Sequence, residues 1–92
     1  MFDKKAALDR ISKILTEKAP PGEPWAIAEK GTMEIASAWI FFYNSQQYLE
    51  TGNVIHALAG NGPVFVDKKT GEVQFYGSTP PLEVIIEKYE KS

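Results

Sequence analysis

The chain has few side chains that could carry out chemistry, and its single histidine is the first to consider. His56 is the only histidine among the 92 residues, so acid–base or metal chemistry based on imidazole would depend on this one position. The nearby Glu50 and Asn53 do not show the ligand spacing of a metal site. We therefore expect no bound metal, and we expect His56 to face solvent or to pack.

The carboxylates and the glycine-rich segment do not suggest an active site either. The carboxylates are scattered along the chain without an acid–base pairing that spacing could reveal: Glu34, Glu50, Asp67 and Glu72. Residues 60–63 read Gly-Asn-Gly-Pro, but no Lys-Ser or Lys-Thr follows, and the proline opens a strand where a phosphate loop would open a helix. A turn is the better interpretation. We expect no catalytic residues, no cofactor and no enzyme.

Composition restricts the cellular compartment and the class of partner that we expect. With 92 residues and 43% hydrophobic content, the chain is predicted to fold as one domain over residues 1–92. A net charge of −2 makes nucleic acid an unlikely partner. No apolar run approaches the roughly 20 residues of a spanning helix, so we expect no membrane segment. The absence of cysteine and of a signal-like N-terminus favours the cytoplasm.

The first half of the chain reads as a helix followed by a hairpin. From Asp3 to Lys18 apolar residues recur every three or four positions, with Asp3 as a plausible N-cap and prolines after Ala19. Residues 25–30 and 33–44 read as two strands joined at residues 30–32, where we expect Gly31 to adopt a positive φ.

The second half predicts a short helical crossover, a second hairpin and a final helix. Residues 45–61 show caps and helical spacing around a bend at residues 51–52. Strands over residues 64–67 and 72–76 enclose a turn with Asp67 at its entry and Gly71 in the left-handed position. The last helix presents one apolar face, formed by Leu82, Ile85, Ile86 and Tyr89. The predicted fold is therefore α+β, with an antiparallel four-stranded sheet made of two hairpins.

Aromatic residues are concentrated in the predicted strands. We expect two long helices and a short one to cover one face of the sheet in so small a chain, which leaves rings on the other face. Val64, Val66, Val73 and Phe75 share one side and predict a core, whereas Phe65, Gln74 and Tyr76 share the other. An exposed aromatic face with a polar fringe is typical of a protein-binding surface. The rings could equally pack under loops or at the seam of a homodimer.

Several motifs, taken in order, resemble the YrhB-like family, also called immunity protein 35. The most specific are Leu-Glu-Thr-Gly at residues 49–52 and Ala-Gly-Asn-Gly-Pro at residues 59–63, and the resemblance covers essentially the whole chain. Asn53 stands where the family usually has Asp, and Ser78 interrupts a common Gly-Thr pair. The resemblance implies a non-enzymatic protein. Some members of the family are predicted to neutralise toxins of bacterial competition systems, and one branch is described as chaperone-like.

Two binding functions follow as hypotheses. The first is an immunity protein that inhibits a cognate toxin by direct binding, and the alternative is a holdase that suppresses the aggregation of unfolded clients. In either case the partner is a protein. The residues that we expect to contact it combine aromatic and acidic character: Tyr48, Glu50, Phe65, Glu72 and Tyr76.

Overall fold

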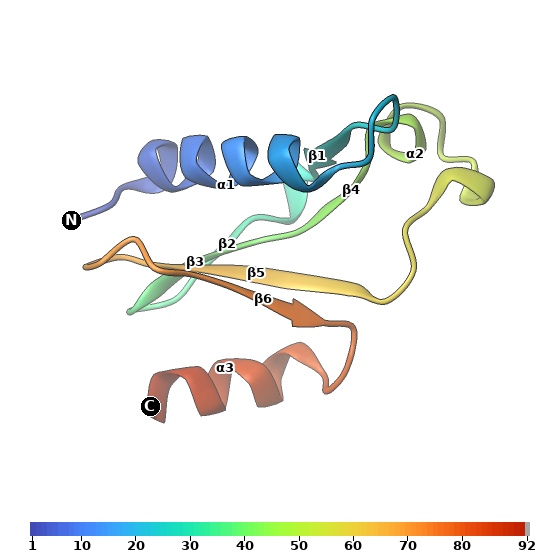
Figure 1. The fold of residues 1–92 in the computed structure, drawn as a ribbon. Coiled ribbons are helices and arrows are strands. Elements are labelled where there is room, and N and C mark those ends of the chain that lie inside the picture. Colours follow the sequence, from blue (N-terminus) through green and yellow to red (C-terminus); the bar gives the residue numbers. More distant parts are fainter. Residues whose placement is uncertain (92) are drawn as a thin grey trace.

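The computed structural model of the chain describes residues 1–91 and consists of three layers (Figure 1). A β-sheet lies in the middle, α1 covers one face and α3 covers the other. The elements in chain order are α1 (Lys4–Lys18), β1 (Trp25–Ile27), η1 (Glu29–Gly31), β2 (Met33–Glu34), β3 (Ala38–Phe41), β4 (Tyr43–Ser45), α2 (Gln46–Thr51), η2 (Val54–His56), β5 (Asn61–Asp67), β6 (Val73–Gly77) and α3 (Leu82–Lys91).

The N-terminal helix forms as its sequence predicts. The carboxylate of Asp3 accepts a hydrogen bond from the backbone N–H of Ala6, which satisfies a free donor in the first turn. The three residues Ala7, Ile11 and Leu15 follow each other at four-residue spacing and are buried against the sheet. The helix ends at Lys18, just before the prolines.

The main sheet is antiparallel, with the strand order β2-β3-β5-β6 in the described chain. Ala38 lies opposite Asp67 and Phe41 opposite Val64, so β3 and β5 form its centre. β1 and β4 pair separately, with Trp25 opposite Ser45. The α+β class and the antiparallel four-stranded sheet are therefore confirmed.

The expectation that one face of the sheet stays uncovered is wrong. Val64 and Val66 face α1 and pack with Phe41, while Phe65 points the other way into a second core with Ile85 of α3. Strands lie about 4.8 Å apart and a helix with its side chains is about 10 Å wide, so one helix and its neighbouring loops can cover each face of a narrow sheet. Because the two long helices lie at opposite ends of the chain, each can occupy its own face.

The first predicted hairpin differs from the structure. The long strand expected over residues 33–44 is broken into β2, β3 and β4, and a turn in which the Ile35 N–H donates to the Ala38 carbonyl separates the first two. The segment around Gly31 is a 3-10 helix, and Gly31 does not adopt a positive φ. β2 pairs with β3, whereas β1 pairs with β4. Alternating apolar residues could not reveal these breaks.

The second predicted hairpin is present. Asp67 accepts hydrogen bonds from the backbone N–H groups of Lys69 and Thr70, and Gly71 has a φ of 76°. That left-handed conformation favours glycine. The bend at residues 51–52 is also present, with Gly52 ending α2 at a φ of 73°. No helix in residues 1–91 has the length and apolar character needed to cross a membrane.

Candidate protein-binding surfaces

Apart from Met1, the most exposed large apolar side chains lie on the segment between β4 and β5. This segment, residues 46–56, contains α2 and η2, and we call it the tip; it lies at the end of the sheet opposite the β5–β6 turn (Figure 1). Val54 and Ile55 are each 78% exposed, and Leu49 is 38% exposed. Exposed apolar side chains that lie close together mark a site of protein interaction.

The backbone of the tip is held in place by polar contacts. The Ser45 hydroxyl accepts a hydrogen bond from the Tyr48 N–H at the start of α2 and donates one to the His56 carbonyl at the end of η2. The side chain of Asn53 accepts from the Ile55 N–H and so caps η2. These bonds fix the conformation that leaves Val54 and Ile55 in solvent, so the exposure is a property of the fold.

A further side chain links the tip to the sheet. The amide oxygen of Asn44 accepts hydrogen bonds from the N–H groups of Ser45 and Leu58, at 2.8 Å in each case. Asn44 and Ser45 are the last two residues of β4. The end of one strand therefore positions the whole tip.

The structure separates the five residues predicted to contact a partner. Tyr48 and Glu50 lie on α2 in the tip, half-buried and exposed respectively. Glu72 is exposed and lies just before the edge strand β6, and Tyr76 is half-buried and lies within that strand. Phe65 is fully buried between β5 and α3, so the expectation that it lies at an accessible surface is wrong.

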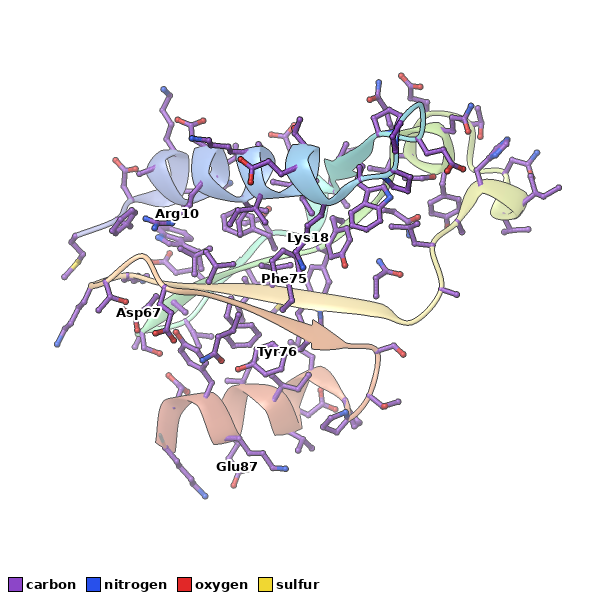
Figure 2. All side chains as sticks on the ribbon, viewed as in Figure 1. Arg10, Lys18, Asp67, Phe75, Tyr76 and Glu87 are labelled. Carbon is purple, nitrogen blue, oxygen red and sulfur yellow. The ribbon has the colours of Figure 1, made fainter. Side chains whose placement is uncertain are left out.

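Phe65 is the centre of an aromatic cluster. Its ring lies 5.0 Å from that of Tyr76 in an edge-to-face arrangement and 4.8 Å from that of Tyr89. Figure 2 shows Tyr76 between β6 and α3, whereas Phe75 points to the opposite side, toward α1. The rings that were expected to form a binding face therefore pack within the protein.

The same side of the sheet contains two linked ionisable groups. The Tyr89 hydroxyl donates to the carboxylate of Asp67. Burial, followed by the neighbouring Asp67 charge, raises the pKa of Tyr89 to about 12. The backbone N–H groups of Thr70 and Lys69 lower the pKa of Asp67. This contact joins α3 to the β5–β6 turn.

Two grooves run along the seam between β6 and α3. The first, of about 350 Å³, is lined by Gln74, Tyr76, Pro80, Ile85, Lys88 and Tyr89. The second, of about 180 Å³, is lined by Ser37, Asp67, Glu72, Gln74, Tyr89 and Glu90. Because Gln74 and Tyr89 line both, the grooves adjoin each other. The first is mainly apolar and contains Lys88, whereas the second contains three carboxylates.

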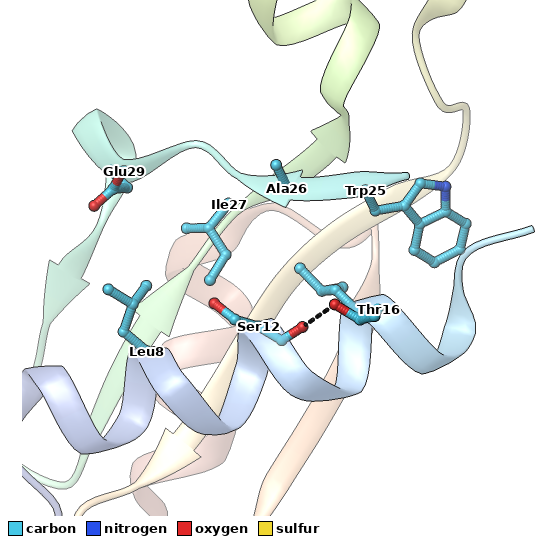
Figure 3. Close-up of a pocket in the computed structure, with 8 residues that line it drawn as sticks. Leu8, Ser12, Thr16, Trp25, Ala26, Ile27 and Glu29 are labelled. Carbon is cyan, nitrogen blue, oxygen red and sulfur yellow. Dashed lines mark hydrogen bonds between the residues drawn. The ribbon is translucent and has the colours of Figure 1, made fainter. Parts of the chain in front are cut away.

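A separate shallow groove of about 280 Å³ lies between α1 and β1 (Figure 3). Its lining includes Ser12, Thr16 and one carboxylate, Glu29. The Thr16 hydroxyl donates to the backbone carbonyl of Ser12, as the dashed line in Figure 3 indicates. This lining offers no acid–base pair, since a single carboxylate and a hydroxyl bonded to its own helix cannot divide those two roles.

His56 lies exposed on η2. Residues 1–91 contain no group of three or more histidine, aspartate or glutamate side chains arranged to hold a metal ion.

The family model described as immunity protein 35 matches residues 5–92 of this chain. The chain belongs to the immunity protein 35 family. Membership accounts for the ordered motifs at residues 49–52 and 59–63. The family description implies a role in binding a protein.

A curated relative of this family member is the uncharacterized protein YrhB of Escherichia coli strain K12. The two sequences are 38% identical over 55 residues, which cover 60% of this chain and 58% of YrhB. No solved structure matches the chain.

The exposed apolar residues of the tip lie in and directly after a family motif. Leu49 belongs to the Leu-Glu-Thr-Gly motif, and Val54 and Ile55 follow it directly. Helical spacing of the apolar residues predicted one or two helical turns over this segment, and the structure has α2 and η2 there. Neither α2 nor η2 contains a buried residue, and Gly52 and Asn53 lie between them as C-cap and N-cap.

Proposed function

We propose that this chain is an immunity protein that neutralises a cognate bacterial toxin by binding it directly, without catalysis. The observation that carries the proposal is an ordered tip with exposed Leu49, Val54 and Ile55 in a member of the immunity protein 35 family. We place the encounter in the cytoplasm, because a chain without cysteine suits a reducing compartment.

The tip combines exposed apolar side chains with one aromatic ring. Val54 and Ile55 supply apolar area, and the half-buried ring of Tyr48 and the carboxylate of Glu50 lie on the same short segment. A few such residues dominate the affinity of most complexes, with polar residues around them. The hydrogen bonds of Ser45 hold these side chains before the partner arrives, which lowers the entropic cost of binding.

The proposal predicts that a gene next to the one for this chain encodes the toxin, and the product of that neighbouring gene is the partner to test. Co-expression should rescue growth, and purification of one protein should retain the other. Ile55→Asp should weaken the complex about 30-fold or more, since truncating a central contact costs about 2 kcal/mol or more. The matched control is Val84→Asp, which places the same charge at an exposed apolar residue of α3.

Two results would count against the proposal. One is the absence of both a complex and growth rescue with the wild-type chain. The other is an equal effect of Ile55→Asp and Val84→Asp, because the tip would then have no special part in binding.

The holdase alternative depended on an exposed aromatic face. Phe41 and Phe65 are fully buried on opposite sides of the sheet, so these rings do not form the exposed face that a holdase would use. Light scattering of unrelated aggregating proteins separates the two functions. A dedicated inhibitor should suppress none of them at stoichiometric ratio.

A further inference from the structure

The edge strand β6 has backbone groups that point away from the sheet. No strand in residues 1–91 pairs with β6 on its outer side. The Asp67 N–H donates to the Glu72 carbonyl, so these two residues form a hydrogen-bonded pair. In an antiparallel ladder such pairs alternate with non-bonded ones, which makes Val66–Val73 and Val64–Phe75 non-bonded. The N–H and C=O groups of Val73 and Phe75 therefore point outward.

This edge lacks the features that usually protect an edge strand. Residues 73–77 read Val-Gln-Phe-Tyr-Gly and contain neither lysine nor proline, and the irregular register of the hairpin lies beyond Phe75. The strand is rich in β-branched and aromatic residues, which favour pairing. Lys18 of α1 lies over the ring of Phe75, 4.2 Å from its centroid, and thus contacts the side chain on the α1 face.

The α3 side of the same edge carries a row of polar side chains. The Tyr76 hydroxyl donates to the side-chain oxygen of Gln74, whose amide donates to the carboxylate of Glu72. The two adjoining grooves lie next to this row. A strand added to β6 would place every second side chain over these grooves.

The charges of the grooves differ from one end to the other. Glu72, Asp67 and Glu90 line the end near the β5–β6 turn, whereas Lys88 lines the apolar end near Tyr76. The hydroxyl of Ser37 is buried at the acidic end and has no hydrogen-bond partner among residues 1–91. A basic side chain placed at this end would meet the three carboxylates.

We propose that an extended segment of the partner protein pairs with β6 as an antiparallel strand, with an apolar residue opposite Tyr76 and a basic residue opposite Glu72. The sequence of this segment is apolar-x-x-x-basic, because those two positions on β6 are four residues apart, about 13 Å. We assign the segment the antiparallel direction that the other strands of the sheet have, and in this direction its basic residue lies at the acidic groove. The inference rests on the proposed function only for the identity of the partner protein.

The test uses the full chain labelled with nitrogen-15 and the peptide acetyl-Ser-Leu-Val-Thr-Val-Arg-Ser-amide. In this register Leu lies opposite Tyr76, Arg opposite Glu72, and the two Val residues bond to Phe75 and Val73. Proton–nitrogen correlation spectra should show the largest shifts at the amides of residues 72–77. The affinity should fall about five- to tenfold when Arg is replaced by Glu.

A peptide N-methylated at both Val residues is the matched control for backbone pairing. It keeps every side chain but lacks the two N–H groups that would donate to the carbonyls of Val73 and Phe75. It should produce no shifts. Equal binding of the methylated peptide, shifts centred on the tip, or no binding at millimolar peptide would each overturn the proposal.

A variant of the chain itself tests the same edge with the peptide left unchanged. Val73→Pro removes an outward N–H that the ladder to β5 does not use, so the hairpin should persist, which circular dichroism can check. Peptide binding should be lost. A free chain that sediments as a dimer and becomes a monomer in this variant would assign the edge to a second copy and overturn the proposal.

The outcome also separates this inference from the proposed function. If Val73→Pro and the wild type neutralise the toxin equally and the peptide does not bind, the edge has no part in binding and the immunity function stands. If the peptide binds as expected but the wild type gives no rescue, the edge binds an extended segment and the proposed immunity function is wrong.

Discussion

Phe65 and Ile55 show how differently the sheet and the tip treat large apolar side chains. Phe65 lies on β5, a central strand of the sheet that forms the middle layer, and is fully buried. Ile55 lies on the one-turn helix η2 and is 78% exposed. Phe41 and Phe65 belong to the aromatic type that usually anchors interfaces, but here both are buried in the core. The comparison teaches that the position of a residue in the layers determines its exposure, and that residue type alone does not.

The two regions are also stabilised by different forces. Each face of the sheet has its own apolar core, centred on Phe41 toward α1 and on Phe65 toward α3. The tip has no buried residue in α2 or η2 and depends on hydrogen bonds from Asn44 and Ser45. Substitutions should therefore affect stability in the sheet and binding in the tip.

The largest effect is expected for Phe65→Ala. Removing this ring leaves a cavity between β5 and α3 and should cost about 3–5 kcal/mol, a large part of the stability of a domain of this size. Ile55→Ala is the matched control in the tip and should change stability by less than about 0.5 kcal/mol. Urea unfolding of both variants measures the difference. Similar costs would mean that the tip is part of the core.

The next largest effect is expected where the chain passes from the tip into β5. A Cβ atom on Gly62 would lie 1.8 Å from the carbonyl oxygen of Gly77, so Gly62→Ala should separate the ends of β5 and β6. We expect a cost of about 3 kcal/mol, at the upper end for over-packing. Chemical denaturation provides the measurement.

Gly60 is a control for that prediction from the same segment. It has a φ of 77° with open space around it, so Gly60→Ala meets only the backbone strain of the left-handed region, about 1 kcal/mol. If Gly60→Ala were as costly as Gly62→Ala, the close approach to Gly77 would not be the cause.

Sequence patterns predicted the elements with strong local signals. The cap at Asp3, the apolar face of the last helix and the turn from Asp67 to Gly71 depend on neighbouring residues, and the structure has all three. The alternation in the second hairpin also separated Phe65 correctly from Val64 and Val66. Local rules were sufficient for these features.

The same patterns could not reveal how the layers are stacked. Whether α3 packs on the face that carries Phe65 depends on contacts between residues 20 or more positions apart, such as Phe65 with Tyr89. The exposure of Val54 likewise depends on Ser45 holding η2 from a distance of 11 positions to His56. The expected exposure of Phe65 was therefore wrong, because contacts between distant parts of the chain bury its ring.

A smaller effect is expected for Ser45→Ala, which tests how the tip is held. The variant loses the cap of α2 and the bond to the His56 carbonyl, and should cost about 1–2 kcal/mol. Hydrogen exchange should accelerate at the amides of residues 48–57 more than in β5. Uniform acceleration across the chain would show that the tip and the sheet open as one unit.

The smallest effect concerns pH and is confined to the sheet region. The lowered pKa of Asp67 means that its ionised form favours the folded state. This contribution is fully present above the ordinary pKa of 3.8 and is lost as the pH falls through the lowered pKa of the folded state. Urea midpoints measured from pH 7 downward should therefore show a difference between wild type and Asp67→Asn that shrinks below pH 3.8.

The ionisation of Tyr89 at alkaline pH gives an independent check of the contact between Tyr89 and Asp67. Tyr89 ionises at about 12 in the folded chain, and its raised pKa means that stability from the neutral hydroxyl is lost as the pH rises from about 10 through that value. Asp67→Asn removes the charge but leaves the burial, so the pKa of Tyr89 should fall only part of the way toward 10. Absorbance at about 295 nm follows tyrosinate formation. No change in this pKa would mean that burial and the charges of Tyr76 and Glu72 raise it without Asp67, and that Asp67 does not link α3 to the turn.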